Sequence, residues 1–123
     1  MNELSDIHWL REPIEHDYGA AENYLQLFYK PKVCRALVKK LRRAKMSTFS
    51  AKDILRASGA SLAEIKTFDW SGQKKQIADG AALAPILLVR QDNGAHLLVA
   101  DGFHRMCALF VQDEQISVPC KIV

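Results

Sequence analysis

Two apolar runs separated by a turn signal constrain the fold of this chain more than any other feature. Residues 85–91 (PILLVRQ) and 95–100 (AHLLVA) have the length and apolar content of β-strands, and Asp-Asn-Gly lies between them at 92–94. Because Asn and Gly tolerate positive φ angles, this arrangement predicts a β-hairpin.

A helix and a final strand complete the C-terminal part of the chain. The second strand runs directly into residues 103–112, where apolar side chains recur at helical spacing. Residues 116–123 (ISVPCKIV) then predict a short strand. Pro119 favours an edge position for this strand, because proline has no N–H to donate to a neighbouring strand.

The first half of the chain predicts helices. Residues 20–29 form the first, with Asp17 as its candidate cap, and residues 31–44 form the second, with a proline in its first turn. Residues 50–59 predict a short helix capped by Ser50 and stopped by a glycine. The side chains expected to be buried are Ala21, Tyr24, Leu25 and Phe28 in the first helix and Val33, Leu37, Leu41 and Ala44 in the second.

The remaining segment leads into the hairpin. Ser61 begins either another capped turn or a strand, and residues 73–80 predict a helix closed by Gly80. The order of elements predicts an α+β fold, with a small mixed sheet and helices packed around it. We expect a single domain over residues 1–123, in which residues 1–60 form a helical part and residues 61–123 form the core.

Length and composition are those of an ordinary globular domain. The chain has 123 residues, of which 49% are hydrophobic and 25% are charged. No apolar stretch is long enough to span a membrane, and the first residues do not resemble a secretory signal. The three cysteines, Cys34, Cys107 and Cys120, show no metal-binding spacing. We therefore expect a cytoplasmic protein with no membrane partner.

Positive charge is concentrated in one segment. Residues 30–45 (KPKVCRALVKKLRRAK) contain eight of the 17 basic residues and no acidic residue, whereas the rest of the chain is acidic on balance. Such a segment is either a solvated helix face or a surface that follows a nucleic-acid backbone.

The junction of the second hairpin strand with its helix predicts an anion site. Asp101 and Gly102 end the strand, and His104 and Arg105 fall in the first helical turn. The exposed N–H groups of a helix start attract anions, and Gly102 allows a ligand to approach the backbone. His104 and Arg105 would add charged donors to a phosphate or carboxylate, while Asp101 would cap the helix or orient His104.

Two other clusters are candidates for catalytic or binding work. Glu15 and Asp17 flank a histidine just before the first helix, where they can act as acid or base groups or simply as capping residues. Asp53 and Arg56 lie three residues apart and form either a surface ion pair or, through Arg56, a second phosphate contact. Neither cluster has the spaced ligands of a metal site, and no metal ligand is assigned.

The C-terminal half resembles the ParB/sulfiredoxin-like domain over residues 61–123. In that family a helix ending in Gly precedes a PI-V strand, a hairpin leads to a G-x-x-R-x-x-A box, and an IPV strand closes the domain. Gly102, Arg105 and Ala108 match the box, and His104 matches the histidine of the G-C-H-R version in sulfiredoxins. The resemblance implies this fold and a nucleotide-phosphate site at the strand–helix junction.

Phe103 departs from the two best-known branches of the family. It stands where sulfiredoxins have a nucleophilic cysteine, so we do not expect reduction of cysteine sulfinic acid. It also replaces the acidic residue of the G-E-R-R form in ParB proteins, which argues against their kind of CTP hydrolysis. The D-G-x-H-R form is closer to other branches, including a free-serine kinase that uses a nucleoside diphosphate.

These observations predict a domain that binds the phosphates of a nucleotide, with Mg²⁺ as a possible companion ion. Asp101, Gly102, His104, Arg105 and Arg56 are the expected phosphate ligands. Asp53, Glu15 and Asp17 are the candidates for a catalytic base in a nucleotide hydrolase or phosphotransferase. Because the sequence shows no evident base, binding without turnover also stays open. The alternative is a non-catalytic adaptor that docks nucleic acid through residues 30–45.

Overall fold

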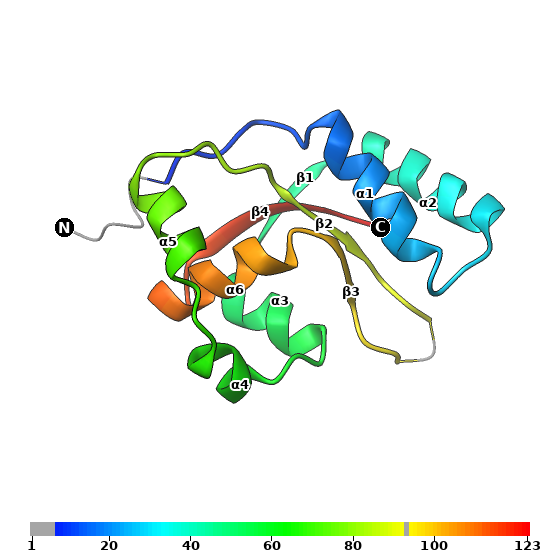
Figure 1. Cartoon of the computed structure of the whole chain (residues 1–123). Helices are drawn as coiled ribbons and strands as arrows, with labels where there is room; N and C mark the ends of the chain where they lie inside the picture. The colour runs from blue at the N-terminus through cyan, green and yellow to red at the C-terminus, as the bar shows by residue number, and fades with distance from the viewer. Residues whose placement is uncertain (1–6, 93) are drawn as a thin grey trace.

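The computed structural model describes residues 7–92 and 94–123. Four strands form one mixed sheet in the order β1-β4-β2-β3 (Figure 1). The strands are β1 (Met46–Ser50), β2 (Ile86–Val89), β3 (Leu98–Asp101) and β4 (Ser117–Ile122). Strand β4 runs antiparallel to β1 and parallel to β2, and β2 and β3 form the antiparallel hairpin. The predicted α+β fold with a small mixed sheet is confirmed.

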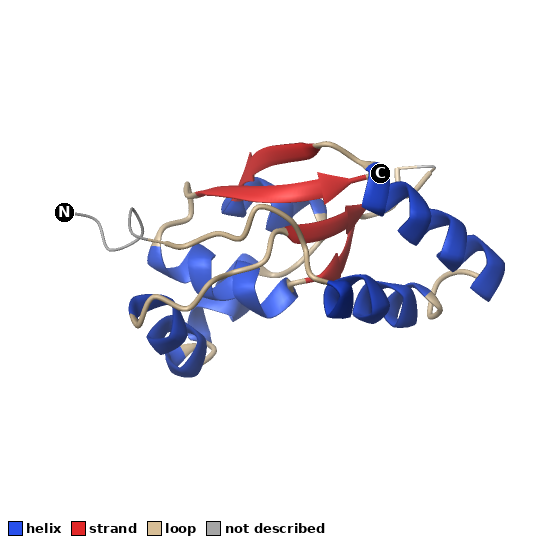
Figure 2. Cartoon of the chain, turned by 90° about the horizontal axis from the view of Figure 1, so that it is seen from above, coloured by secondary structure: helices blue, strands red, loops and turns tan. Residues whose placement is uncertain are grey.

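Helices cover both faces of the sheet (Figure 2). The helices are α1 (Glu15–Leu25), α2 (Pro31–Arg43), α3 (Ala51–Ala57), α4 (Leu62–Thr67), α5 (Ser71–Ala78) and α6 (Phe103–Gln112). Helices α1 and α2 pack on one face, and α3 to α6 pack on the other.

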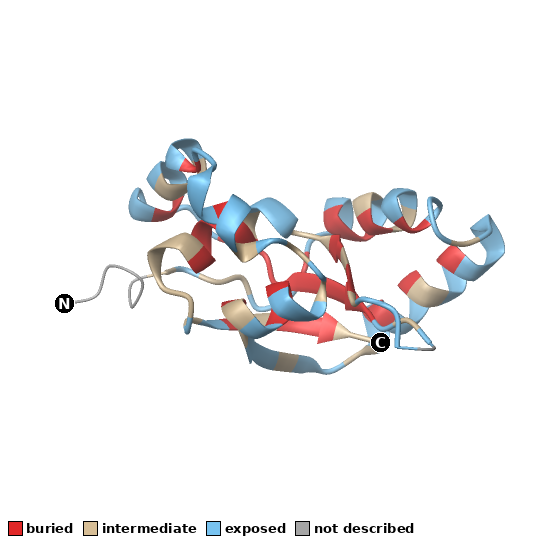
Figure 3. Cartoon of the chain, turned by 90° about the horizontal axis from the view of Figure 1, so that it is seen from below, coloured by how far each residue is buried: buried red, intermediate tan, exposed pale blue. Residues whose placement is uncertain are grey.

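Alternation along strand β2 divides the core into two layers. Ile86 and Leu88 belong to the cluster under α3 to α6, whereas Leu87 and Val89 belong to the cluster under α1 and α2. Because successive side chains of a strand point to opposite faces, a wholly apolar strand is expected where both faces are covered. All four residues of β2 are buried, while the helices expose their outer sides (Figure 3).

The expectation of an edge position for the last strand is wrong. Strand β4 lies inside the sheet, between β1 and β2. Pro119 is opposite Thr48 of β1, but the pairing of β4 with β2 begins only at Cys120. Pro119, which has no N–H, therefore lies where β4 is paired with β1 alone.

Strand β1 is an element that the sequence did not predict. Its residues alternate poorly between buried and exposed positions, because it forms an edge and is only partly covered. The N-terminal half is therefore not purely helical, and it shares one sheet with the C-terminal half. Ser50 ends the strand and caps α3, since its hydroxyl accepts a hydrogen bond from the Asp53 N–H at 3.1 Å.

The first helix begins earlier than expected. It starts at Glu15, so Asp17 lies inside its first turn rather than before it. The Asp17 carboxylate accepts a hydrogen bond from the Ile14 N–H at 3.2 Å, which satisfies a free donor of the helix start. Tyr24 and Phe28, expected to be buried, are substantially exposed.

The buried stripe of the second helix is also shifted. Cys34, Val38 and Leu41 face the sheet, whereas Val33 is exposed and Leu37 is half-buried. The predicted bounds of the other helices agree better with the structure. Helix α6 spans the predicted range, and α4 settles the alternative at Ser61 in favour of a capped helix.

Within the described residues, none of the helices has both the length and the apolar character that crossing a membrane requires.

The central strand gives the first testable prediction. Leu88 is fully buried between β4 and β3, so Leu88→Ala should lower the free energy of unfolding by about 2–5 kcal/mol through lost burial and a new cavity. Leu27→Ala, at a side chain that is 78% exposed, is the matched control and should change it by less than about 0.5 kcal/mol. Urea denaturation of both variants measures the difference. Equal effects would contradict the assignment of the core.

Candidate functional site

The junction of β3 and α6 depends on a glycine. Gly102 has φ +100°, in the left-handed region that side chains other than hydrogen rarely adopt. A Cβ atom there would lie 2.5 Å from Cδ1 of Ile86 and 2.9 Å from Nη2 of Arg105. The arginine guanidinium is thus folded back over the Gly102 backbone, and the turn has no room for a larger residue.

Arg105 forms an ion pair with the last residue of β3. Its Nη2 donates a hydrogen bond to Oδ2 of Asp101 at 3.2 Å, and the two side chains are only 26% and 15% exposed. The Nε atom of Arg105 is buried and has no hydrogen-bond partner among the described residues. A guanidinium has five N–H donors, so this one retains donor capacity beyond its bond to Asp101.

A second carboxyl group from α1 completes this cluster. Asp17 is only 4% exposed and adjoins Asp101. Burial raises the pKa of Asp101 above its ordinary value, and the neighbouring Asp17 carboxyl acts in the same direction. The Arg105 guanidinium lowers that pKa but does not cancel the rise. Asp17, Asp101 and Arg105 thus form a partly buried group of two carboxyl side chains and one guanidinium.

Helix α6 begins without a side-chain cap. Gly102 is the N-cap residue, and the expectation that Asp101 caps the helix is wrong, because its carboxylate binds Arg105 instead. The first helical hydrogen bond runs from the Met106 N–H to the Gly102 carbonyl at 3.0 Å. The first turn contains no acidic residue, so its N–H groups present an uncompensated positive end.

A cleft of about 790 Å³ opens beside this helix start. Two aromatic pairs line it. Tyr24 of α1 and Phe28, in the turn that follows α1, have ring centroids 5.3 Å apart. Phe103 and His104 of α6 have centroids 6.2 Å apart. The other lining residues come from the end of α3 and from the hairpin; they are Ser58, Gly59, Ala60, Gln91, Gly94, Ala95, His96, Leu97, Leu98 and Val99.

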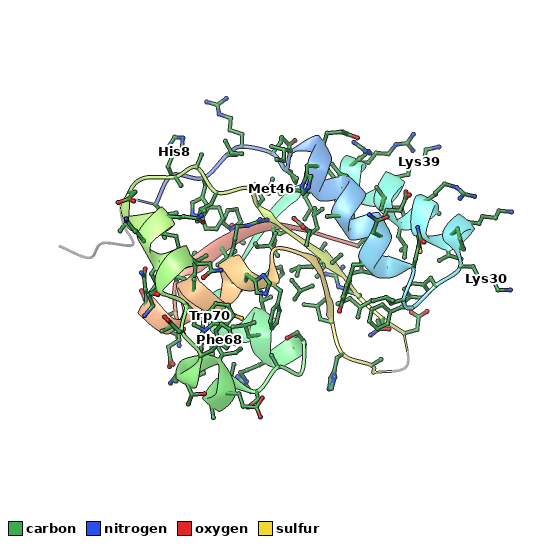
Figure 4. All side chains as sticks on the ribbon, viewed as in Figure 1. His8, Lys30, Lys39, Met46, Phe68 and Trp70 are labelled. Atoms are coloured by element: carbon green, nitrogen blue, oxygen red, sulfur yellow. The ribbon has the colours of Figure 1, made fainter. Side chains whose placement is uncertain are left out.

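His104 connects the cleft to a second aromatic group. The centroid of its ring lies 5.9 Å from that of Trp70. The Trp70 and Phe68 rings, both labelled in Figure 4, have centroids 4.6 Å apart. The Trp70 Nε1–H donates to the Ile65 carbonyl at 2.8 Å, so the indole is fixed. The fixed Trp70 ring therefore lies beside the His104 ring and helps to hold it at the cleft.

The other predicted site residues lie elsewhere. Glu15 is exposed and pairs with Arg42 of α2, which lowers its pKa. Arg56 and Asp53 form an exposed pair at 3.8 Å on α3, and neither is among the described residues that line the large cleft. Asp53 instead borders a smaller pocket of about 310 Å³. Of the candidates, Asp17, Asp101, Gly102 and Arg105 come together, and His104 lies on the adjacent cleft.

The sequence missed the far wall of the cleft. Tyr24 lies in the last turn of α1 and Phe28 in the turn that follows the helix. Their helical spacing predicted burial, so it did not point to the wall of a cleft. The position of His96 over Gly59 could not be predicted from the sequence, because it depends on how the hairpin packs against the end of α3.

Among residues 7–92 and 94–123, no group of three or more His, Cys, Asp or Glu side chains is arranged to hold a metal ion. Comparison with known proteins finds no matching family model, no matching curated protein and no matching solved structure.

Substitution of Gly102 tests the junction. Gly102→Ala should lower the free energy of unfolding by about 1–3 kcal/mol or more, because it combines an unfavourable φ with a clash against Ile86. Gly19→Ala is the control, since Gly19 lies in α1 with nothing within 4 Å and should gain roughly 0.5–1 kcal/mol of helix stability. Thermal and urea unfolding measure both. If Gly102→Ala left the free energy of unfolding unchanged, the argument that this position requires a glycine would be contradicted.

Titration of Asp101 tests the carboxyl pair. We expect carbon-detected NMR to find the Asp101 pKa above its ordinary value, and Asp17→Asn to lower it by removing a negative charge. A raised folded-state pKa means that the folded state keeps a proton that the unfolded chain has lost. The contribution of Asp101 to stability therefore falls as the pH rises from its pKa in the unfolded chain to its higher pKa in the folded state. An unchanged Asp101 pKa in Asp17→Asn would refute the contact.

Proposed function

We propose that this domain binds a nucleotide, with its phosphates at the start of α6 and its base in the adjacent cleft. The observation that carries the proposal is the helix start itself, which has no cap and no acid in its first turn and borders a cleft of about 790 Å³. Ligand-binding clefts typically have volumes of about 300–1,000 Å³.

The phosphate end of the site has three kinds of donor. The first N–H groups of α6 point out of the helix start, where the peptide dipoles favour an anion. His104 lines the cleft from the same turn. The guanidinium of Arg105 lies over Gly102 and has donors to spare. Charged donors of this kind suit phosphate oxygens better than neutral ones.

The base end of the site is aromatic. Tyr24 and Phe28 form one wall and Phe103 contributes to the other, and all three side chains are about two-fifths exposed. Flat aromatic rings stack on nucleobases without requiring a particular base. The resemblance of residues 61–123 to ParB/sulfiredoxin-like domains supports the same ligand class.

One observation favours turnover as a second function. The Asp17 and Asp101 carboxyls adjoin the helix start, and the raised pKa of Asp101 suits a group that accepts and returns a proton. We infer a nucleotide hydrolase or phosphotransferase in which this pair acts as the base. Mg²⁺ would arrive with the nucleotide phosphates and neutralise their charge, since the described residues provide no metal cage of their own.

Ligand binding is tested with a panel of nucleotides. ATP, ADP, CTP and GTP, each with and without Mg²⁺, should include at least one that raises the melting temperature, because a ligand of the folded state stabilises it. His104→Ala should weaken that binding roughly 10-fold, consistent with the loss of one charge-assisted hydrogen bond. His8→Ala removes an exposed histidine that does not line the cleft and should leave binding unchanged. The proposal would be contradicted if none of the nucleotides bound, or if His104→Ala and His8→Ala changed the affinity equally.

Turnover is tested separately. Phosphate release or transfer from the bound nucleotide should fall at least about 100-fold in Asp17→Asn, the usual range for loss of an acid–base group, while binding persists. Asp53→Asn is the matched control, because that carboxylate is exposed and paired on α3. Turnover that survives Asp17→Asn would remove the pair as the base and leave the binding proposal intact.

A further inference from the structure

The outer face of α2 is an array of positive charge without counterions. Its five exposed members within the helix are Lys32, Arg35, Lys39, Lys40 and Arg43, and Lys30 and Lys45 flank the two ends of α2. None of these seven forms an ion pair with an acidic group that the structure describes. Several cations elsewhere in the protein are paired, as Arg42 is with Glu15 and Lys121 with Glu12. The sequence has no acidic residue between Glu22 and Asp53.

Helical geometry centres the cations of α2 itself on the side opposite the sheet. Cys34, Val38 and Leu41 face the sheet, and at about 100° per residue the opposite side is centred on Lys32, Lys39 and Arg43. Lys30 and Lys39 extend away from the body of the molecule (Figure 4). The helix has 13 residues, so the array is about 20 Å long.

The stability of the helix does not explain this pattern. Cations in the last turn of α2 are favoured by the helix dipole, but the first turn also carries Lys32, follows Lys30 and contains no acid. Positive charge at a helix start is unfavourable for the isolated helix. Like charges one turn apart, such as Arg35 and Lys39, repel each other as well. An external polyanion would relieve both effects.

The composition of this face distinguishes between kinds of polyanion. A helix that lies in a membrane surface needs several bulky apolar residues beside its cations, yet Ala36 lies at the centre of this face and Val33, to one side, is the exposed bulky apolar residue of α2. Lysine is depleted from protein–protein interfaces, where aromatic anchors dominate. The nearby exposed Leu27 and Phe28 lie in the turn between α1 and α2, and Phe28 lines the cleft.

We propose that the outer face of α2 binds the sugar–phosphate backbone of nucleic acid without reading its sequence. Double-stranded DNA carries one negative charge per about 1.7 Å of axis, so an array of this length faces on the order of ten phosphates. Contacts to phosphates fix position but carry no base information. This surface is independent of the nucleotide cleft.

The experiment uses the full chain and fluorescent 20-base-pair duplexes of DNA and of RNA. Fluorescence anisotropy should show binding that weakens about 100-fold between 50 and 200 mM salt, as release of counterions from about four phosphates requires. The variant Lys32→Gln/Arg35→Gln/Lys39→Gln/Arg43→Gln should bind at least about 100-fold more weakly than the unaltered protein at 50 mM salt. Gln has nearly the helix propensity of Lys and Arg, so the fold should persist, and circular dichroism checks this. If the fourfold variant is unfolded, Lys32→Gln/Lys39→Gln takes its place and should weaken binding about 10-fold.

A charge-matched control separates this surface from net charge. Arg11→Gln/Lys66→Gln/Lys75→Gln/Arg90→Gln removes four exposed cations from other places and should change the affinity by less than about 3-fold. Equal losses in the two variants would overturn the proposal. The proposal would also be overturned if neither duplex bound at 20 mM salt. This holds equally if the protein then bound vesicles of phosphatidylserine or an acidic peptide. Binding of only one duplex would retain the surface and assign it to DNA or to RNA.

Discussion

The parallel pairing of β4 with β2 is the contact on which the other parts of the fold depend. Strand β4 joins β1, from the first half of the chain, to the hairpin formed by the second half. Because β4 occupies this inner position, β3 becomes an edge, with α1 on one face of the sheet and α6 on the other. The cleft opens at this edge, where residues of α1, the hairpin and α6 meet. The position of one strand therefore determines where a ligand can enter.

Local patterns predicted the elements better than their arrangement. The hairpin, α6 and the stop signals Gly59 and Gly80 depend on neighbouring residues, and the sequence shows them directly. The inner position of β4 depends on pairing with β1 across about 70 residues, which no local pattern contains. Strand β1 itself lacked alternation because its outer side has no neighbour. Long-range pairing was thus the part that sequence reasoning could not supply.

The candidate site shows the same division. The glycine at the turn from β3 to α6 was visible in the sequence, but the return of the Arg105 guanidinium over it and the ion pair of Arg105 with Asp101 were not predicted. The approach of Asp17 to Asp101 was not predicted either, since it depends on how α1 packs on the edge strand. Asp53 and Glu15 looked equally suitable as acids, yet each is exposed and paired with an arginine of its own surroundings. Burial rather than residue type separates Asp17 from them.

The most direct test of the account is an NMR titration of the isotopically labelled protein with inorganic pyrophosphate. We predict that the amide signals of Phe103, His104 and Arg105 shift first and saturate together, because the phosphate would be held by the N–H groups at the start of α6. Shifts confined to α2, or the absence of saturable shifts at the start of α6, would contradict a phosphate site at the junction of β3 and α6.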